Sequence, residues 1–281
     1  MQTSQTLTVA NEPGAVTVKA GSRTHRSTDA ITGPLGQIAR GCSGLVVREP
    51  ARFEAGGQSL ELPRYVFLGP KGGSEPVRIG IFAGIHGDEP AAAFALVRFV
   101  RLLENYPEMA RGYCLFLYPL CNPGGFADDT RHNRNGKDLN REFWRNSGEP
   151  EVRLLEAELR EHTLQGIISL HTDDTSDGIY GYAHGPVIAE NLLRPALDAG
   201  AAFLPRNDAG VIDGFRAKEG VIRAGYEGVL RSPPGVRPRP FEIVLETPQH
   251  APNYLQEAAL SVALHSILEE YRKFIAYAQN I

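Results

Sequence analysis

The chain has 281 residues, of which 42% are hydrophobic and 22% are charged, as is ordinary for a soluble globular protein. This length suits one large α/β domain or two small ones. The formal net charge of −4 and the isoelectric point near 6.1 lack the basic excess typical of proteins that bind nucleic acid or anionic membranes. We therefore expect neither of these partners, and the oligomeric state stays open.

The three cysteines, Cys42, Cys114 and Cys121, have neither the number nor the spacing of a disulfide framework or a zinc ribbon. The first residues lack the basic and apolar regions of a signal peptide. No apolar run approaches the roughly 18 residues that cross a bilayer. These features predict a soluble, cytoplasmic protein.

The domain organisation follows from composition and periodicity. Residues 1–43 are rich in Thr, Ser, Gly and Ala and show weak periodicity, which predicts an N-terminal arm or short elements packed on the main domain. Residues 44–281 contain no internal repeat and no linker, and we expect them to form a single domain.

Apolar runs and helical periodicity alternate along this domain. The runs predict strands at 45–47, 65–68, 77–85, 113–118, 166–170 and 241–245. Apolar residues at helical spacing predict helices at 90–103, 152–159, 187–199 and 260–271. A long polar loop follows 113–118, and the irregular stretch 205–240 is typical of a lid or binding loop. The alternation predicts an α/β fold in which a mixed, mostly parallel sheet is flanked by helices on both faces.

Polar side chains follow four of the predicted strands. His86 and Glu89 come after the first buried strand, Asn140 and Arg141 end the loop after the second, and His171 and Glu246 follow the other two. Ligand sites of open α/β sheets lie beyond the carboxyl ends of the strands. The sequence therefore predicts that these side chains converge at one edge of the sheet.

A catalytic zinc ion takes three protein ligands and leaves one position for water. His86 and Glu89 lie three residues apart across a strand-to-helix turn, and His171 would complete a set of two histidines and one glutamate. Each of these residues could also have an ordinary structural role. A glutamate before Pro90 suits a helix N-terminus, and a histidine after a strand is usually a polar loop residue.

Five segments occur in a characteristic order: HGDE at 86–89, NPGG at 122–125, RHNRNGKDLNR at 131–141, LHTD at 170–173 and LETP at 245–248. This set resembles the zinc carboxypeptidase family, which includes the succinylglutamate desuccinylase and aspartoacylase branch. The resemblance implies a mixed, mostly parallel sheet between helices, and it makes 44–281 a zinc carboxypeptidase-like catalytic domain.

The resemblance also implies roles for individual residues. His86, Glu89 and His171 would bind one Zn²⁺ ion. Glu246 would be the general base, and Arg131 would stabilise the developing oxyanion. Glu242 shares the strand parity of Glu246 and is its rival, but Glu246 is preferred because it ends the strand beside Thr-Pro.

The substrate-binding assignments leave several alternatives open. Asn140 and Arg141 resemble the pair that grips the terminal carboxylate of the substrate, although the segment Asp138-Leu139-Asn140 also suits a cap or brace of the loop. Arg134 is an alternative to Arg131 as the functional arginine, because branches of the family differ in this loop. Both arginines could also be ordinary solvated charges of the loop. Tyr226 resembles the mobile tyrosine that closes over substrate in carboxypeptidases.

Tyr180 and Tyr182 are alternatives to that tyrosine. Arg231, in the same irregular stretch, is a candidate for recognising an acidic side chain. Asp173 or Asp174 is better interpreted as support for the metal site than as a ligand.

The leading interpretation is a zinc metallohydrolase that cleaves an amide bond next to a free carboxylate in a peptide or an N-acyl amino acid. An N-acyl-amino-acid deacylase is the alternative. One helix follows Glu246, without the additional β domain common in the deacylases, which favours a peptidase, whereas the short interval from Glu89 to His171 favours a deacylase. A non-catalytic metal- or peptide-binding module is a third interpretation, weakened because no expected ligand, base or anion-binding residue is missing.

Overall fold

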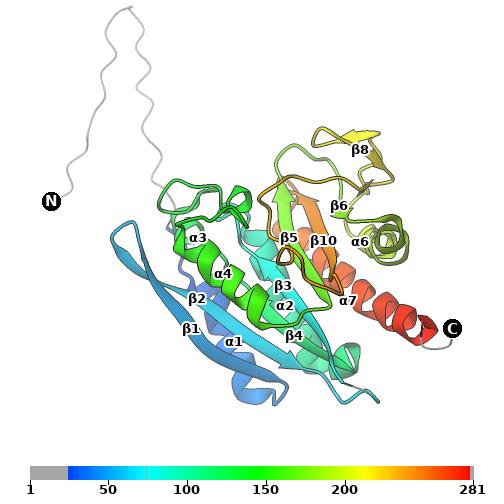
Figure 1. The fold of residues 1–281 in the computed structure, drawn as a ribbon, viewed down its shortest axis with the longest axis horizontal. Coiled ribbons are helices and arrows are strands. Elements are labelled where there is room, and N and C mark those ends of the chain that lie inside the picture. The colour runs from blue at the N-terminus through cyan, green and yellow to red at the C-terminus, as the bar shows by residue number, and fades with distance from the viewer. Residues whose placement is uncertain (1–24, 74, 279–281) are drawn as a thin grey trace, which may run out of the picture.

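A computed structural model describes residues 25–73 and 75–278 (Figure 1). The strands are β1 (Leu45–Ala55), β2 (Gln58–Leu68), β3 (Val77–Ala83), β4 (Tyr113–Tyr118), β5 (Gly166–Asp173), β6 (Tyr180–Ala183), β7 (Val211–Ile212), β8 (Phe215–Lys218), β9 (Val221–Ile222) and β10 (Phe241–Pro248). The helices are α1 (Asp29–Gly41), α2 (Pro90–Asn105), α3 (Pro123–Asp128), α4 (Pro150–Glu161), α5 (Pro186–Ile188), α6 (Arg194–Gly200) and α7 (Asn253–Ala278). Short helical turns are η1 (Pro107–Ala110), η2 (Leu139–Arg141) and η3 (Ala189–Leu193).

The strands form one mixed sheet in the order β1-β2-β4-β3-β5-β10-β6-β9-β8-β7. The four central strands, β4, β3, β5 and β10, pair in parallel. Antiparallel pairs flank them, through β2 on one side and β6 on the other. The expected mixed sheet with helices on both faces is confirmed, and its parallel part is the centre, where the strand ends that carry the site residues lie side by side.

Alternate residues of the central strands serve two separate cores. Ile79 and Ile81 of β3 pack in the core under α1, α2 and α7, whereas Phe82 packs in the core under α4. Helix α4 contributes Val152 and Leu155 from its apolar stripe to this second core. Figure 1 shows α4 on one side of the sheet and α2 and α7 on the other. The strands are apolar on both faces because both faces are covered.

Local geometry explains the differences from the predicted elements. Strand β3 ends at Ala83 rather than at residue 85, because Gly84 adopts a φ of +63° and turns the chain. The polar loop contains the short helix α3, whose first turn is capped by the Asn122 side chain, which accepts a hydrogen bond of 2.8 Å from the Gly125 amide. The irregular stretch 205–240 contains β7, β8 and β9, which extend the sheet at its edge.

Part of the expected N-terminal arm is a regular helix. Helix α1 buries Ile31, Leu35 and Ile38 and contacts α2 and β1. Residues 1–24 lie outside the described residues, so the predicted boundary at residue 43 stays a prediction. Within 25–73 and 75–278, none of the helices has the length and apolarity that crossing a membrane requires.

Candidate metal centre

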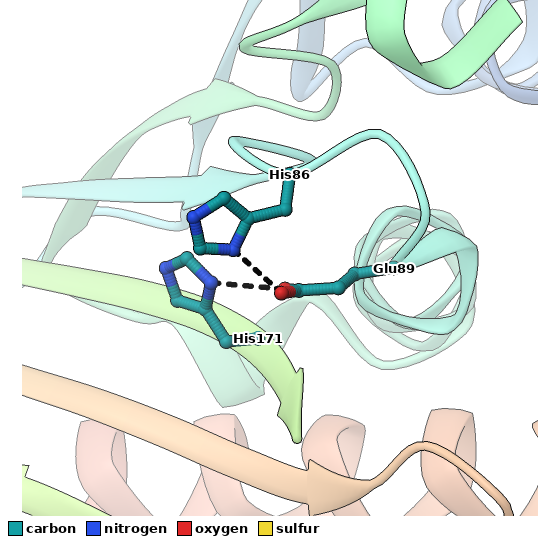
Figure 2. Close-up of side chains that lie close together, drawn as sticks. All are labelled: His86, Glu89 and His171. Carbon is teal, nitrogen blue, oxygen red and sulfur yellow. Dashed lines mark hydrogen bonds and ion pairs between the residues drawn. The ribbon is translucent and has the colours of Figure 1, made fainter. Parts of the chain in front are cut away.

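Two strand-to-loop turns bring His86, Glu89 and His171 together. His86 and Glu89 belong to the turn between β3 and α2, where Glu89 directly precedes the first helical residue, and His171 lies near the end of β5. All three side chains are buried, and each offers a ligand atom within 4.8 Å of the others. Figure 2 shows the two imidazoles side by side, with one nitrogen of each ring facing the Glu89 carboxylate.

The orientation of each ring is set by contacts on both of its nitrogens. Nδ1 of His86 lies 2.5 Å from Oε1 of Glu89, and Nδ1 of His171 lies 2.9 Å from Oε2 (Figure 2). The outer Nε2 atoms contact Asp138 at 3.2 Å and Ser169 at 3.3 Å. The two Nδ1 atoms therefore both face the Glu89 carboxylate, while the contacts of the Nε2 atoms hold the rings in place.

The electrostatics of the group are those of a buried ion pair. Burial lowers the pKa of His86, but the charges and hydrogen bonds of Glu89 and Asp138 outweigh it and raise this pKa to about 9. Burial raises the pKa of Glu89, but the two imidazoles lower it well below its usual value. The pKa of His171 is lowered, with burial as the main cause. Glu89 is thus held as a carboxylate.

This donor set fits a divalent transition metal. Two imidazole nitrogens and one carboxylate oxygen are typical ligands of a catalytic zinc site. A hydrogen bond from the far nitrogen of a ligand histidine to a carboxylate, as between His86 and Asp138, is the usual support of such a ligand.

A second group in the described part of the chain fits a metal less well. Glu158, Glu161 and His162 also lie within ligand distance of one another. The two carboxylate oxygens of Glu158, however, each accept a hydrogen bond of 2.5 Å from an arginine, one from Arg48 and one from Arg64. Two guanidinium charges on one carboxylate oppose the binding of a further cation.

The His86 group opens into a cavity of about 790 Å³. Its wall combines acidic, basic and aromatic side chains from the strand ends and from the stretch 205–240. The residues singled out from the sequence that line it are His86, Glu89, Arg131, Asn140, Arg141, Asp173, Asp174, Tyr180, Tyr182, Tyr226, Arg231, Glu242 and Glu246. The structure thus brings most of the predicted site residues to one hollow.

Glu246 and its rival Glu242 both line this cavity, but their surroundings differ. Oε1 of Glu242 accepts hydrogen bonds from the amide and the hydroxyl of Ser232, and Oε2 pairs with Arg239 at 2.8 Å. Glu246 has no such partner among the described residues. Burial, followed by the charges of nearby carboxylates, first that of Glu89, raises the pKa of Glu246 well above its usual value. Glu246 is the carboxylate that is free to accept a proton.

Asp138 links Arg131 to the histidine cluster. Its Oδ2 accepts from Nη2 of Arg131 at 3.2 Å, while its Oδ1 contacts His86 and accepts from the Asn140 amide at 2.9 Å. Arg131 also lies 3.6 Å from Oε1 of Glu89. The guanidinium is therefore held beside the candidate metal centre. Within the expected brace of Asp138, Leu139 and Asn140, the Asp138 carboxylate caps the turn by accepting from the Asn140 amide.

Asn140 and Arg141 form another part of the cavity wall. Oδ1 of Asn140 accepts a hydrogen bond of 2.9 Å from the Leu230 amide, which leaves its Nδ2 as the donor for a ligand. The guanidinium of Arg141 donates to the Asn140 carbonyl at 2.8 Å and lies 4.3 Å from the centre of the Tyr226 ring. The pair presents adjacent donors to the cavity.

Tyr226 is held by Asp213, a residue that the sequence analysis did not single out. The Tyr226 hydroxyl donates to Oδ1 of Asp213 at 2.9 Å, and the Tyr182 hydroxyl donates to Oδ2 at 2.7 Å. Asp213 and Gly214 form the turn between β7 and β8, with φ values of 50° and 77°. An Asp-Gly pair between short apolar runs is a hairpin signal, so the hairpin was detectable although its contact with the two tyrosines was not.

The structure separates two further residues predicted from the sequence, Arg134 and Asp173, by whether they line the cavity. Arg134 does not line the cavity, because its guanidinium pairs with Asp128 at 2.9 Å and also contacts Gln58, so its expected substrate contact is not supported. Asp173 lines the cavity and accepts a hydrogen bond of 2.9 Å from the Tyr180 hydroxyl, and it lies outside the group that can hold a metal.

Comparisons with known proteins agree with this geometry. Residues 77–205 match the family described as "Succinylglutamate desuccinylase/Aspartoacylase catalytic domain". A presumed metallopeptidase from Shewanella amazonensis SB2B is 25% identical, with a TM-score of 0.70 over 85% of this chain and 91% of its own. A metallo-carboxypeptidase from Burkholderia cenocepacia is 16% identical, with a TM-score of 0.67 over 89% of this chain and 70% of its own.

The thrombin activatable fibrinolysis inhibitor is 17% identical, with a TM-score of 0.63 over 87% of this chain and 74% of its own. At such identities the last two structures show the shared fold alone. No curated protein matches the sequence. The matched segment 77–205 includes the candidate ligands His86, Glu89 and His171. The family match and the 25% identical metallopeptidase structure thus bear out the resemblance that the five sequence segments indicate.

Proposed function

We infer that this protein is a zinc-dependent hydrolase that cleaves an amide bond next to a free carboxylate, in the manner of a carboxypeptidase. One observation carries the proposal: the group that fits a metal, an unpartnered carboxylate and a pair of carboxylate-binding donors share one cavity. The residues that line the cavity are His86, Glu89, Glu246, Asn140 and Arg141, and His171 completes the metal group beside Glu89.

Substrate binding begins at Asn140 and Arg141. The free Nδ2 of Asn140 and the guanidinium of Arg141 donate hydrogen bonds to the terminal carboxylate of the substrate, since an arginine fork matches a carboxylate in shape and charge. This contact orients the scissile amide towards the histidine cluster. Positioning of this kind converts binding energy into a lower barrier.

His86, Glu89 and His171 would hold the zinc ion. When bound there, zinc supplies Lewis acidity, which lowers the pKa of water and polarises a carbonyl. Arg131, held beside Glu89 by Asp138, donates hydrogen bonds to the oxygen on which negative charge develops.

Glu246 moves the proton. It accepts a proton from the attacking water as the bond between the water oxygen and the carbonyl carbon forms. It then donates this proton to the amide nitrogen as the bond between carbon and nitrogen breaks, so that a carboxylic acid and an amine leave. The raised pKa of Glu246 suits both halves of this transfer near neutral pH.

The family match supports a second candidate function. The description "Succinylglutamate desuccinylase/Aspartoacylase catalytic domain" of the segment 77–205 favours an N-acyl-amino-acid deacylase. The chemistry at the amide would be the same, and the two functions differ in whether the acyl side is a peptide or a small acyl group.

Metal analysis paired with hydrolysis assays tests the proposal. We expect the purified chain to bind about one zinc ion, and the zinc-loaded chain to hydrolyse N-acyl dipeptides or N-acyl amino acids that end in a free carboxylate. The His86→Ala variant should lose both zinc and activity, whereas the exposed His250→Ala control should keep both. Stoichiometric zinc without turnover of either substrate class would instead indicate a non-catalytic binding module.

A further inference from the structure

Arg26 contacts the turn of the candidate metal centre from a distant part of the chain. It lies just before α1, outside the matched segment 77–205. Its Nη1 donates a hydrogen bond of 2.8 Å to the carbonyl of Gly87, which lies between the candidate ligands His86 and Glu89. Figure 2 shows these two side chains at the two ends of one turn. Arg26 therefore holds the backbone between two candidate ligands.

The same arginine is anchored on α3. Nη2 of Arg26 pairs with Asp129, and its guanidinium lies 5.4 Å from the centre of the Phe126 ring. The backbone amide of Arg26 donates to the Ala127 carbonyl at 2.9 Å. A guanidinium presents its nitrogens in a planar fork, so one side chain can bridge a carboxylate and a carbonyl. Arg26 thus ties the turn to the C-terminal end of α3.

The turn and α3 also touch backbone to backbone. Gly87 is buried, and a Cβ at this position would lie 1.9 Å from the backbone carbon of Gly125 in α3. Only glycine allows so close an approach. Two backbones in contact without side chains have little surface to interlock. The hydrogen bond from Arg26 therefore supplies the directional contact that this packing lacks.

The next carbonyl of the turn is held from another direction. Nε2 of Gln249, which follows β10, donates to the Asp88 carbonyl at 2.7 Å, and the Gln249 amide donates to the Asp173 carbonyl of β5 at 2.9 Å. Two consecutive peptide groups are thus fixed, one by Arg26 from the side of α3 and one from the sheet. The orientation of these peptide groups sets the separation of the two candidate ligands.

We propose that Arg26 is a positioning residue of the metal centre. By holding the Gly87 carbonyl against α3, it keeps His86 and Glu89 at the separation that metal binding requires. The proposal rests on the proposed function, because it takes these side chains as metal ligands. Arg26 is not among the residues that line the cavity, so it acts through the turn.

Zn²⁺ affinity tests this proposal without any substrate. We expect Arg26→Gln to raise the dissociation constant for Zn²⁺, measured by chelator competition, by about tenfold or more, as the loss of a group that orients a ligand does. Arg272→Gln is the matched control. Arg272 is likewise partly buried, donates to the Met109 carbonyl at 2.8 Å and lies 5.5 Å from the centre of the Tyr113 ring, away from the cavity. This control should bind Zn²⁺ as the native chain does.

Kinetics at saturating Zn²⁺ separate positioning from substrate binding. We expect kcat of Arg26→Gln to fall by about tenfold or more, because displaced ligands misplace the reacting groups. KM should stay near its native value, because Asn140 and Arg141 keep their contacts. A raised KM with native kcat would contradict a role that acts through the metal ligands.

Native Zn²⁺ affinity in Arg26→Gln would overturn the proposal and leave the hydrolase function intact. An equal loss of affinity in Arg272→Gln would also overturn it, because the cause would then be general stability. If Arg26→Gln does not fold, the same outcomes apply to Arg26→Lys, which keeps the charge but has one nitrogen for two acceptors.

The native chain provides the remaining distinction. If Arg26→Gln selectively loses Zn²⁺ affinity but the zinc-loaded native chain hydrolyses no substrate, the role of Arg26 stands and the hydrolase function fails. A native chain that binds no Zn²⁺ would disprove both.

Discussion

His171 on β5 and Glu246 on β10 are register partners in adjacent parallel strands. Register partners of a parallel pair project their side chains to the same face of the sheet. The candidate ligand and the candidate base therefore lie on the same face of the sheet as a direct consequence of backbone pairing, and Glu246 lines the cavity there. On its other side, Glu246 pairs with Tyr180 of β6, which lines the cavity as well.

The Glu246→Gln variant tests whether the carboxylate beside the candidate metal centre transfers the proton. The amide keeps the size of the side chain but cannot accept the proton, so we expect kcat to fall by a factor of about 10²–10⁴. Zinc content should stay at the native level because Glu246 lies outside the metal group. Single-turnover assays combined with metal analysis would check this, and a variant with native kcat would rule out Glu246 as the base.

Asp138→Asn should weaken the metal centre without removing a ligand. Asp138 contacts Nε2 of His86 and pairs with Arg131, so its loss removes the support of a ligand histidine and of the arginine together. We expect metal affinity or kcat/KM to fall by about 10- to 100-fold. Chelator competition measures the affinity. Asp128→Asn, which breaks the pair with Arg134 away from the cavity, is the matched control and should leave both quantities unchanged.

Gly87→Ala should destabilise the turn between His86 and Glu89. A Cβ at this position would lie 1.9 Å from the backbone carbon of Gly125, a distance that no side-chain movement can relieve. We expect a clear fall in Tm together with loss of metal binding, because the turn must shift away from α3. Gly148→Ala, where a Cβ meets nothing within 4 Å, should melt like the native chain in differential scanning calorimetry.

Glu158→Gln should reduce stability in a way that depends on pH. Burial raises the pKa of Glu158, but the hydrogen bonds from His162, Tyr118, Arg64 and Arg48 outweigh it and hold this pKa far below the ordinary value of a glutamate carboxyl. A lowered folded-state pKa stabilises the fold above the unfolded-state pKa, and this contribution is lost as the pH falls below it. Removing the carboxylate should cost roughly 1.5–3 kcal/mol at pH 7, because two partly exposed guanidinium groups lose a charge-assisted hydrogen bond.

Urea denaturation at several pH values would test this. The difference between the native chain and Glu158→Gln should be largest at neutral pH and should shrink as the pH falls below about 4.5. Glu61→Gln is the control, because Glu61 pairs with Arg52 at the surface, where both side chains are more than half exposed. Its effect should stay within about 1 kcal/mol at any pH. A difference that does not vary with pH would contradict the electrostatic explanation.

The sequence by itself determined the layered α/β fold and the types of residue at the strand ends. Apolar runs and helical stripes report which faces are covered, since burial must follow the period of each element. His86, Glu89, His171 and Glu246 could be singled out because each follows an apolar run or precedes a predicted helix, and such positions lie at one edge of the sheet.

Only the tertiary structure shows which partners hold rival side chains whose local sequence signals are similar. Arg131 and Arg134 occupy the same loop, yet only Arg131 reaches the cavity, because Asp138 and Asp128 hold the two guanidinium groups in different directions. Glu242 and Glu246 share one face of a strand, and they differ only in the partners that the stretch 205–240 brings to Glu242.

The position of Arg231 shows why the partners of a loop residue cannot be predicted from the local sequence pattern. It depends on the hydrogen bond between Asn140 and Leu230, which lie 90 residues apart, and on the one between Trp144 and Arg231, 87 residues apart. Periodicity reflects contacts within one element and its two faces. The path of an irregular segment is set by single hydrogen bonds to distant residues, and these exist only once the sheet has brought the segments together.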